Sequence, residues 1–141
     1  MVADDVSGAG HHRLALGWNL PDAPWSSKGH TIRLRTSKGQ VSLSVEGGDL
    51  SVYRAGECVA GQPLAGASAR WGWWSPAYGR RQPGLRVIAF AIVPLPMRFI
   101  SRWILGGRVA PVKLEWRAPG EGPAAISRVR LGRAELRLGD G

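Results

Sequence analysis

Apolar residues recur at every second position through much of this chain. That period is the signature of a β-strand with one buried face, whereas a helix would repeat every three to four residues. Short turns that carry glycine separate the alternating runs, as in antiparallel hairpins. The polar face of each run is rich in Ser or Arg, which is typical of a sheet with one face in water. The clearest runs are residues 12–18, 32–35, 41–45 and 112–116.

Two further segments complete the pattern. Leu85–Val93 is apolar at successive positions, which indicates a central strand covered on both sides. Met97–Leu105 fits a short strand or a short helix, because its apolar residues also lie at helical spacing between a proline and two glycines. Together the runs predict an all-β fold, an antiparallel β-sandwich of about 8–10 short strands.

The domain organisation is expected to be simple. A chain of 141 residues can bury a sizeable core without disulfides. We expect residues 1–9, which are polar and acidic, to be disordered or frayed, and residues 10–141 to form a single β-sandwich domain. The N-terminal stretch lacks the basic start and apolar centre of a signal peptide. The longest apolar run is too short to span a bilayer, so no membrane partner is expected and the localisation stays open.

Residues that support catalysis or cofactor binding are sparse. The single Cys58 excludes an internal disulfide and a cysteine-based metal site. The three His are poorly spaced for metal ligands, and the ten acidic residues form no obvious catalytic pair. Neither a phosphate-cradling glycine loop nor a nucleophile elbow is present. We therefore predict no catalytic residue, no metal and no cofactor.

The charge balance is strongly basic. The formal net charge is +9, and all but three of the 19 basic residues are Arg. Such a charge attracts polyanions, namely nucleic acids, acidic glycans or anionic membranes. A GC-rich genome would also favour Arg, together with Gly, Ala and Pro. Composition alone leaves both explanations open.

Residues 70–81 concentrate the chemistry of the chain. They contain three of the seven Trp, one Tyr and three Arg. Aromatic rings stack on sugars or bases, and guanidinium groups bind carboxylates and sulfates through two hydrogen bonds. Residues 74–79 read as a strand that runs into a turn started by proline and closed by glycine. The predicted carbohydrate-binding residues are Trp73, Tyr78, Arg80 and Arg81.

A structural role for the aromatic residues is an open alternative. Trp and Tyr commonly build the cores of small β-domains, and Trp71 or Trp73 could serve only that purpose. Tyr78 and the two arginines after it fall on the predicted turn, where binding groups are often exposed.

The sequence resembles the β-domain of the heparinase II/III-like family over residues 10–105. Residues 73–79, Trp-Trp-Ser-Pro-Ala-Tyr-Gly, followed by Pro83 and an apolar strand, resemble a segment near the end of that domain. The other similar segments are residues 10–21, with Asn19 where the family more often has His, the hairpin 41–53 and the closing segment 95–99.

The resemblance implies the C-terminal sandwich of a polysaccharide lyase. In that family an N-terminal helical toroid packs on the sandwich, and uronic-acid polymers are cleaved between them by β-elimination. The catalytic Asn, Tyr and His come from the toroid and from the first sandwich strands, and no residue here matches them. The resemblance thus implies an acidic-polysaccharide partner, a chain that is not active alone, and a toroid supplied in cis or by a separate chain.

Further expectations depend on that resemblance. A sandwich without its first strands would expose a sheet edge, so self-association through that edge is expected. Bacterial members of the family are often periplasmic or associated with the cell envelope. Two other interpretations stay open. One is a small nucleic-acid-binding β-domain, which scattered arginines make the less favoured choice. The other is a purely structural or interaction module.

Overall fold

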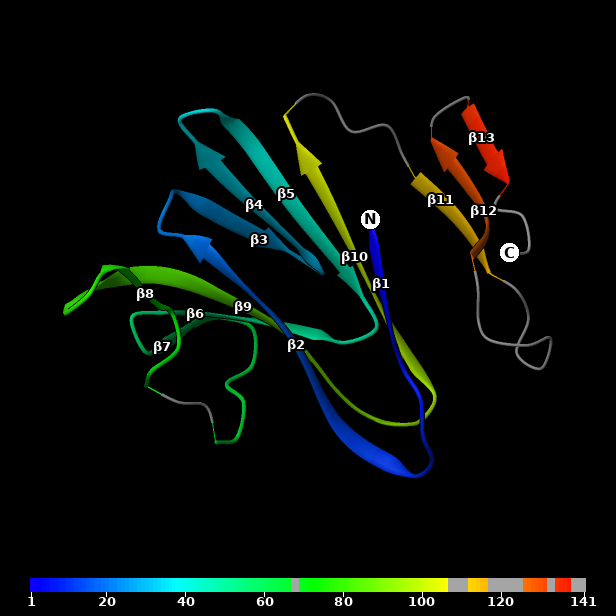
Figure 1. Ribbon diagram of the computed structural model, residues 1–141, viewed down its shortest axis with the longest axis horizontal. Helices are drawn as coiled ribbons and strands as arrows, with labels where there is room; N and C mark the ends of the chain where they lie inside the picture. The colour runs from blue at the N-terminus through cyan, green and yellow to red at the C-terminus, as the bar shows by residue number, and fades with distance from the viewer. Residues whose placement is uncertain (67–68, 107–111, 117–125, 132–133, 138–141) are drawn as a thin grey trace. The chain divides into compact units, whose positions relative to one another are not determined.

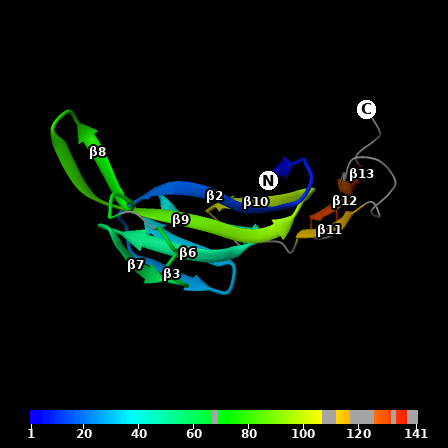
Figure 2. The same ribbon diagram turned by 90° about the horizontal axis from the view of Figure 1, so that it is seen from below.

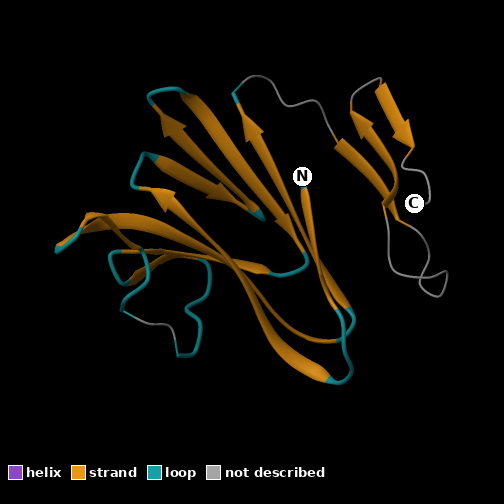
Figure 3. Cartoon of the chain, in the orientation of Figure 1, coloured by secondary structure: helices purple, strands orange, loops and turns teal. Residues whose placement is uncertain are grey.

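The computed structural model describes a chain built from β-strands (Figures 1 and 3). It divides into two compact units, residues 1–106 and 107–141. No helix long and apolar enough to cross a membrane is found among the described residues. The described residues are 1–66, 69–106, 112–116, 126–131 and 134–137.

The first unit consists of two antiparallel sheets packed face to face, which confirms the predicted β-sandwich (Figure 2). In one sheet the strand order is β1 (Val2–Val6), β10 (Met97–Leu105), β5 (Gly39–Glu46), β4 (Thr31–Thr36) and β3 (Trp25–Lys28). In the other sheet the order is β2 (His11–Pro21), β9 (Arg80–Pro94), β6 (Asp49–Arg54) and β7 (Glu57–Ala60), and β8 (Trp73–Ala77) pairs with the start of β9.

The second unit is a three-stranded antiparallel sheet in the order β11 (Val112–Trp116), β12 (Ile126–Leu131) and β13 (Ala134–Arg137). β11 coincides with the alternating run at residues 112–116. We expected one domain over residues 10–141, whereas the sandwich occupies the chain up to Gly106 and this sheet forms a unit of its own.

The N-terminus differs from the expected frayed segment, because residues 2–6 form β1 along β10. Asp5 lies opposite Arg98 in this pairing, and the Arg98 Nη2 donates a hydrogen bond of 2.6 Å to the Asp5 Oδ2. Asp5, one of the acidic residues that suggested a solvated tail, therefore forms an ion pair with Arg98 on the neighbouring strand. Pairing with β1 and β5 on its two sides also settles Met97–Leu105 as a strand.

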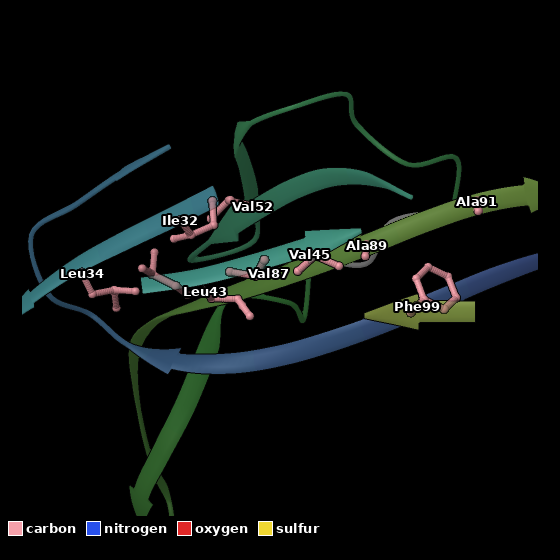
Figure 4. Packing of buried hydrophobic residues seen from close by; sticks show 10 residues of the cluster. Ile32, Leu34, Leu43, Val45, Val52, Val87, Ala89, Ala91 and Phe99 are labelled. Carbon is pink, nitrogen blue, oxygen red and sulfur yellow. The ribbon is translucent and has the colours of Figure 1, made fainter. Parts of the chain in front are cut away.

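The core lies between the two sheets and contains the apolar face of each alternating run (Figure 4). Residues from β4, β5 and β10 face residues from β6 and β9. Because opposite sheets supply these side chains, the period of two in the sequence becomes one continuous apolar layer. The buried residues include Ile32, Leu34, Leu43, Val45, Val52, Leu85, Val87, Ala89 and Phe99.

The outer face of the second sheet is also partly covered. The chain after β7 crosses it: the Ser51 Oγ donates a hydrogen bond of 2.6 Å to the carbonyl of Gln62, and the Leu64 N–H donates one of 2.7 Å to the Tyr53 hydroxyl. The Trp71 ring packs edge-on against the Tyr53 ring at a centroid distance of 5.0 Å. This cover explains why the middle of β9 is apolar on both faces.

Candidate functional site

The predicted site lies on a hairpin that projects from one end of the sandwich, which we call the arm, residues 73–83 (Figure 2). It consists of β8 and the first residues of β9, joined by a turn at Tyr78 and Gly79. Gly79 has a φ of 70°, a conformation that glycine adopts without strain. The side chain of Tyr78 is fully exposed at this turn. The structure thus brings all four predicted residues into one exposed element.

A bulge shapes the arm. Trp74 lies opposite Gln82 and Ala77 lies opposite Arg80, so two β8 residues face a single residue of β9 between these pairs. One of the two is Pro76, which has no N–H to donate to the ladder. The hydroxyl of Ser75 lies 2.7 Å from the carbonyl oxygen of Ala77 and 2.6 Å from that of Arg80, and donates across the turn. These contacts hold the turn where the ladder is interrupted.

Trp73 and Arg81 interact on one face of the arm. The Cζ of Arg81 lies 4.2 Å from the centroid of the Trp73 ring, a cation–π contact. The Trp73 Nε1–H donates a hydrogen bond of 3.1 Å to the carbonyl of Ala69, which fixes the half-buried indole. Trp73 therefore holds a guanidinium in place, and the ring face toward Arg81 is already occupied.

The other predicted residues point elsewhere. Residues at alternate positions of a strand share a face, so Arg80 lies on the face opposite Arg81, together with Gln82 and Trp74. Both Arg80 and Trp74 are exposed. The four predicted residues thus divide into Trp73 and Arg81 on one face, Arg80 on the other, and Tyr78 at the tip.

Four residues at the base of the arm were not predicted from the sequence as part of the site. The Arg86 Nη1 donates a hydrogen bond of 3.0 Å to the Asn19 Oδ1 on the neighbouring strand, and Gly17 lies beneath the same guanidinium. Trp74 was in the aromatic segment but was not selected. The signals present in the sequence were the place of Trp74 in the aromatic segment and the Asn at position 19.

The electrostatics of the arm differ from those of the sandwich body. In the body, hydrogen bonds from Arg98 and Arg54 lower the pKa of Asp5 and of Asp22, respectively, below their ordinary values. The arm itself contains no acidic residue, and within the described part of the chain no carboxylate pairs with its arginines. No group of three His, Cys, Asp or Glu close enough to hold a metal occurs among the described residues. The arm is thus a cationic and aromatic surface.

Comparison with known proteins adds no assignment. No protein-family model, curated protein or solved structure matches this chain. The resemblance to the heparinase II/III-like family stays a prediction that depends on the sequence segments named above.

Proposed function

We propose that this β-sandwich binds acidic polysaccharide through its arm, as the non-catalytic terminal sandwich of a heparinase II/III-like lyase. The observation that carries the proposal is the Arg81 guanidinium held over Trp73 at 4.2 Å on an exposed hairpin. Arg80 and the fully exposed Tyr78 lie on the same hairpin, which contains no acidic residue. A polymer of acidic sugars matches this combination of fixed positive charge and aromatic surface.

The chemistry assigns a different task to each residue. A guanidinium binds a carboxylate or sulfate through paired hydrogen bonds, and a guanidinium held by a ring loses less side-chain entropy on binding. The exposed ring of Tyr78 can pack against the apolar face of a sugar. In the proposed lyase a helical toroid, in cis or on a separate chain, supplies the groups that remove the proton. This sandwich binds and orients the polymer.

The test is binding of heparin and alginate to the full chain, measured by calorimetry at fixed ionic strength. Replacing Arg80 and Arg81 with Ala is expected to weaken binding at least about tenfold, because charge-assisted hydrogen bonds are lost. The control variant replaces Arg33 and Arg35 with Ala. These two exposed residues of β4 carry the same charge on the sandwich body. Neutral dextran is the control polymer.

Two outcomes contradict the proposal. If both double variants lose the same affinity, net charge alone attracts the polymer and the arm has no special role. If single-stranded DNA binds more tightly than heparin at the same salt concentration, with a steep salt dependence, the chain is a nucleic-acid-binding domain instead.

A further inference from the structure

A second cationic and aromatic feature lies at the base of the arm, on the face opposite Arg81. Alternation along β9 places Arg80, Gln82 and Arg86 on the outward face of the second sheet. Trp74 lies on this face too, because it is paired directly with Gln82. The surface of the arm is therefore continuous with the outer surface of the sandwich.

Arg86 is fixed on this face by two neighbours on β2. Its Nη1 donates to the Asn19 Oδ1 at 3.0 Å. Its guanidinium lies against the backbone of Gly17, where an added Cβ would come within 2.6 Å of the Nη2. A glycine in the middle of a strand costs stability, and here its absent side chain is what makes room for the guanidinium. The arginine is thus held in one place before any ligand arrives.

The charge of Arg86 has no counter-charge among the described residues. Asn19 is neutral, and the Arg86 Nε is buried with no hydrogen-bond partner. In contrast, Arg54 and Arg98 each bind a carboxylate in the described structure. A partly buried cation is more stable with an anion beside it, because water no longer solvates it fully.

An exposed aromatic ring lies next to this cation. A Cβ added at Gly84 would lie 3.6 Å from the Cβ and Cδ1 of Trp74, so the indole packs along β9 at that position. Gly84 and Arg86 are two residues apart, which is roughly 7 Å along a strand. Trp74 is 47% exposed, so one part of its ring is available to a ligand.

We propose that this face is a uronate subsite, with the sugar ring on Trp74 and its carboxylate on Arg86. The inference rests on the proposed function and specifies a ligand class, a sugar that carries a carboxylate. Asn19 accepts from Arg86 through its Oδ1, which leaves its Nδ2 to donate to the same carboxylate. Arg80 lies on the same face of β9, about 20 Å farther along the strand toward the tip of the arm, so it would meet the polymer several sugar residues away.

The experiment follows the Arg86 Nε–H and the Trp74 indole N–H by NMR in the full chain, with both signals assigned from the Arg86→Lys and Trp74→Phe variants. Sodium glucuronate is expected to shift both signals in a saturable way. Glucose, which lacks the carboxylate, should shift neither. Inorganic phosphate is the control for binding of a simple anion. It should shift the Arg86 signal alone, because it has no sugar ring to contact Trp74.

Substitutions of Arg86 and of the strand β2 residues beside it provide a second test. Gly17→Ala should abolish the glucuronate response, because the added methyl group occupies the position of the guanidinium. Ala15→Ser is the matched control, since Ala15 is an exposed residue on the same face of the same strand. Arg86→Lys keeps the charge and removes the planar fork, so it should weaken the response at Trp74 even if Gly17→Ala fails to fold.

The outcomes separate this inference from the proposed function. If glucuronate leaves the Arg86 signal unchanged while the arm variants lose polymer binding, the subsite is wrong and the proposed function stands. If glucuronate shifts both signals while the arm variants bind polymer normally, the subsite stands and the arm proposal fails. Equal responses to glucuronate and phosphate, with Trp74 unmoved, would overturn the uronate assignment.

Discussion

Two parts of the same strand, β9, behave differently. Between Leu85 and Ala91 the inward side chains are buried against the other sheet. In the arm, residues 80–82 are exposed although the strand pairing continues. The difference lies in what faces the strand, since the first sheet covers the inward side of one part and only β8 accompanies the other part. One strand thus contributes both to the core and to an exposed surface, and substitutions in the two parts should have separable effects.

The largest effect is expected in the body. Leu43 is fully buried between the sheets. Leu43→Ala should lower the free energy of unfolding by about 2–5 kcal/mol, because it removes apolar contacts and leaves a cavity. Urea unfolding followed by tryptophan fluorescence measures the change. A loss below about 1 kcal/mol would mean that the two sheets do not pack as described.

Alanine substitutions at two glycines, one at the base of the arm and one at its tip, compare how tightly these regions are packed. Gly72 and Gly79 have φ values of 75° and 70°, so alanine is strained at both. At Gly72 an added Cβ would also lie 2.7 Å from backbone atoms of Tyr53 and Arg54, whereas at Gly79 nothing lies within 4 Å. Gly72→Ala should cost about 2–4 kcal/mol and Gly79→Ala about 1 kcal/mol.

The unfolding midpoints of the two variants, measured side by side, provide the comparison. Equal losses would show that the base of the arm is not packed against β6.

Acid should affect the body more than the arm. The hydrogen bond from Arg98 lowers the pKa of Asp5 below its ordinary value of 3.8. A carboxyl with a lowered folded-state pKa stabilises the fold above its unfolded pKa, and this stabilisation is lost as the pH falls through the folded value. The Asp5 side chain is 55% exposed and solvent weakens its interaction with Arg98, so we expect a contribution of about 0.2–1 kcal/mol.

Unfolding measured from neutral pH down through the acid range should therefore show a smaller acid-dependent loss in Asp5→Asn than in the wild type. An identical pH dependence in the two proteins would contradict the role of this ion pair in holding β1.

The smallest effect on stability is expected at the tip of the arm. Tyr78 is fully exposed and Tyr78→Ala should change the free energy of unfolding by no more than about 0.5 kcal/mol. The same variant should weaken heparin binding, since the exposed ring is lost. A clear loss of stability would mean that the tip packs against the body and is no separate binding surface.

Much of the fold could be predicted from local pattern. The alternation of apolar residues predicted the strands and their buried faces, because side chains on a strand point to opposite sides in turn. The alternation of apolar residues did not predict segments whose structure depends on pairing with a distant strand. Residues 2–6 look like a polar tail but form β1 through contacts with β10, which lies far away in the sequence. The two glycines at positions 106 and 107 indicated a turn but did not predict that a separate unit begins there.

The candidate site was predicted only in part. The composition of residues 70–81 singled out this segment, and the four predicted residues lie on its hairpin. Their division between two faces depends on the register with β9, including a bulge that composition does not reveal. Arg86 and Asn19 are 67 positions apart and meet only because β2 pairs with β9.

The sequence by itself determined the period of the strands, the basic charge and the place where aromatic and arginine residues gather. These properties are local, since each depends on neighbours within a few residues. Only the tertiary structure decided which alternating faces become core, which stretch of β9 projects as an arm, and which arginines lack a carboxylate partner in the described part of the chain. Those properties depend on strand pairing and sheet packing, which bring together residues that the sequence keeps far apart.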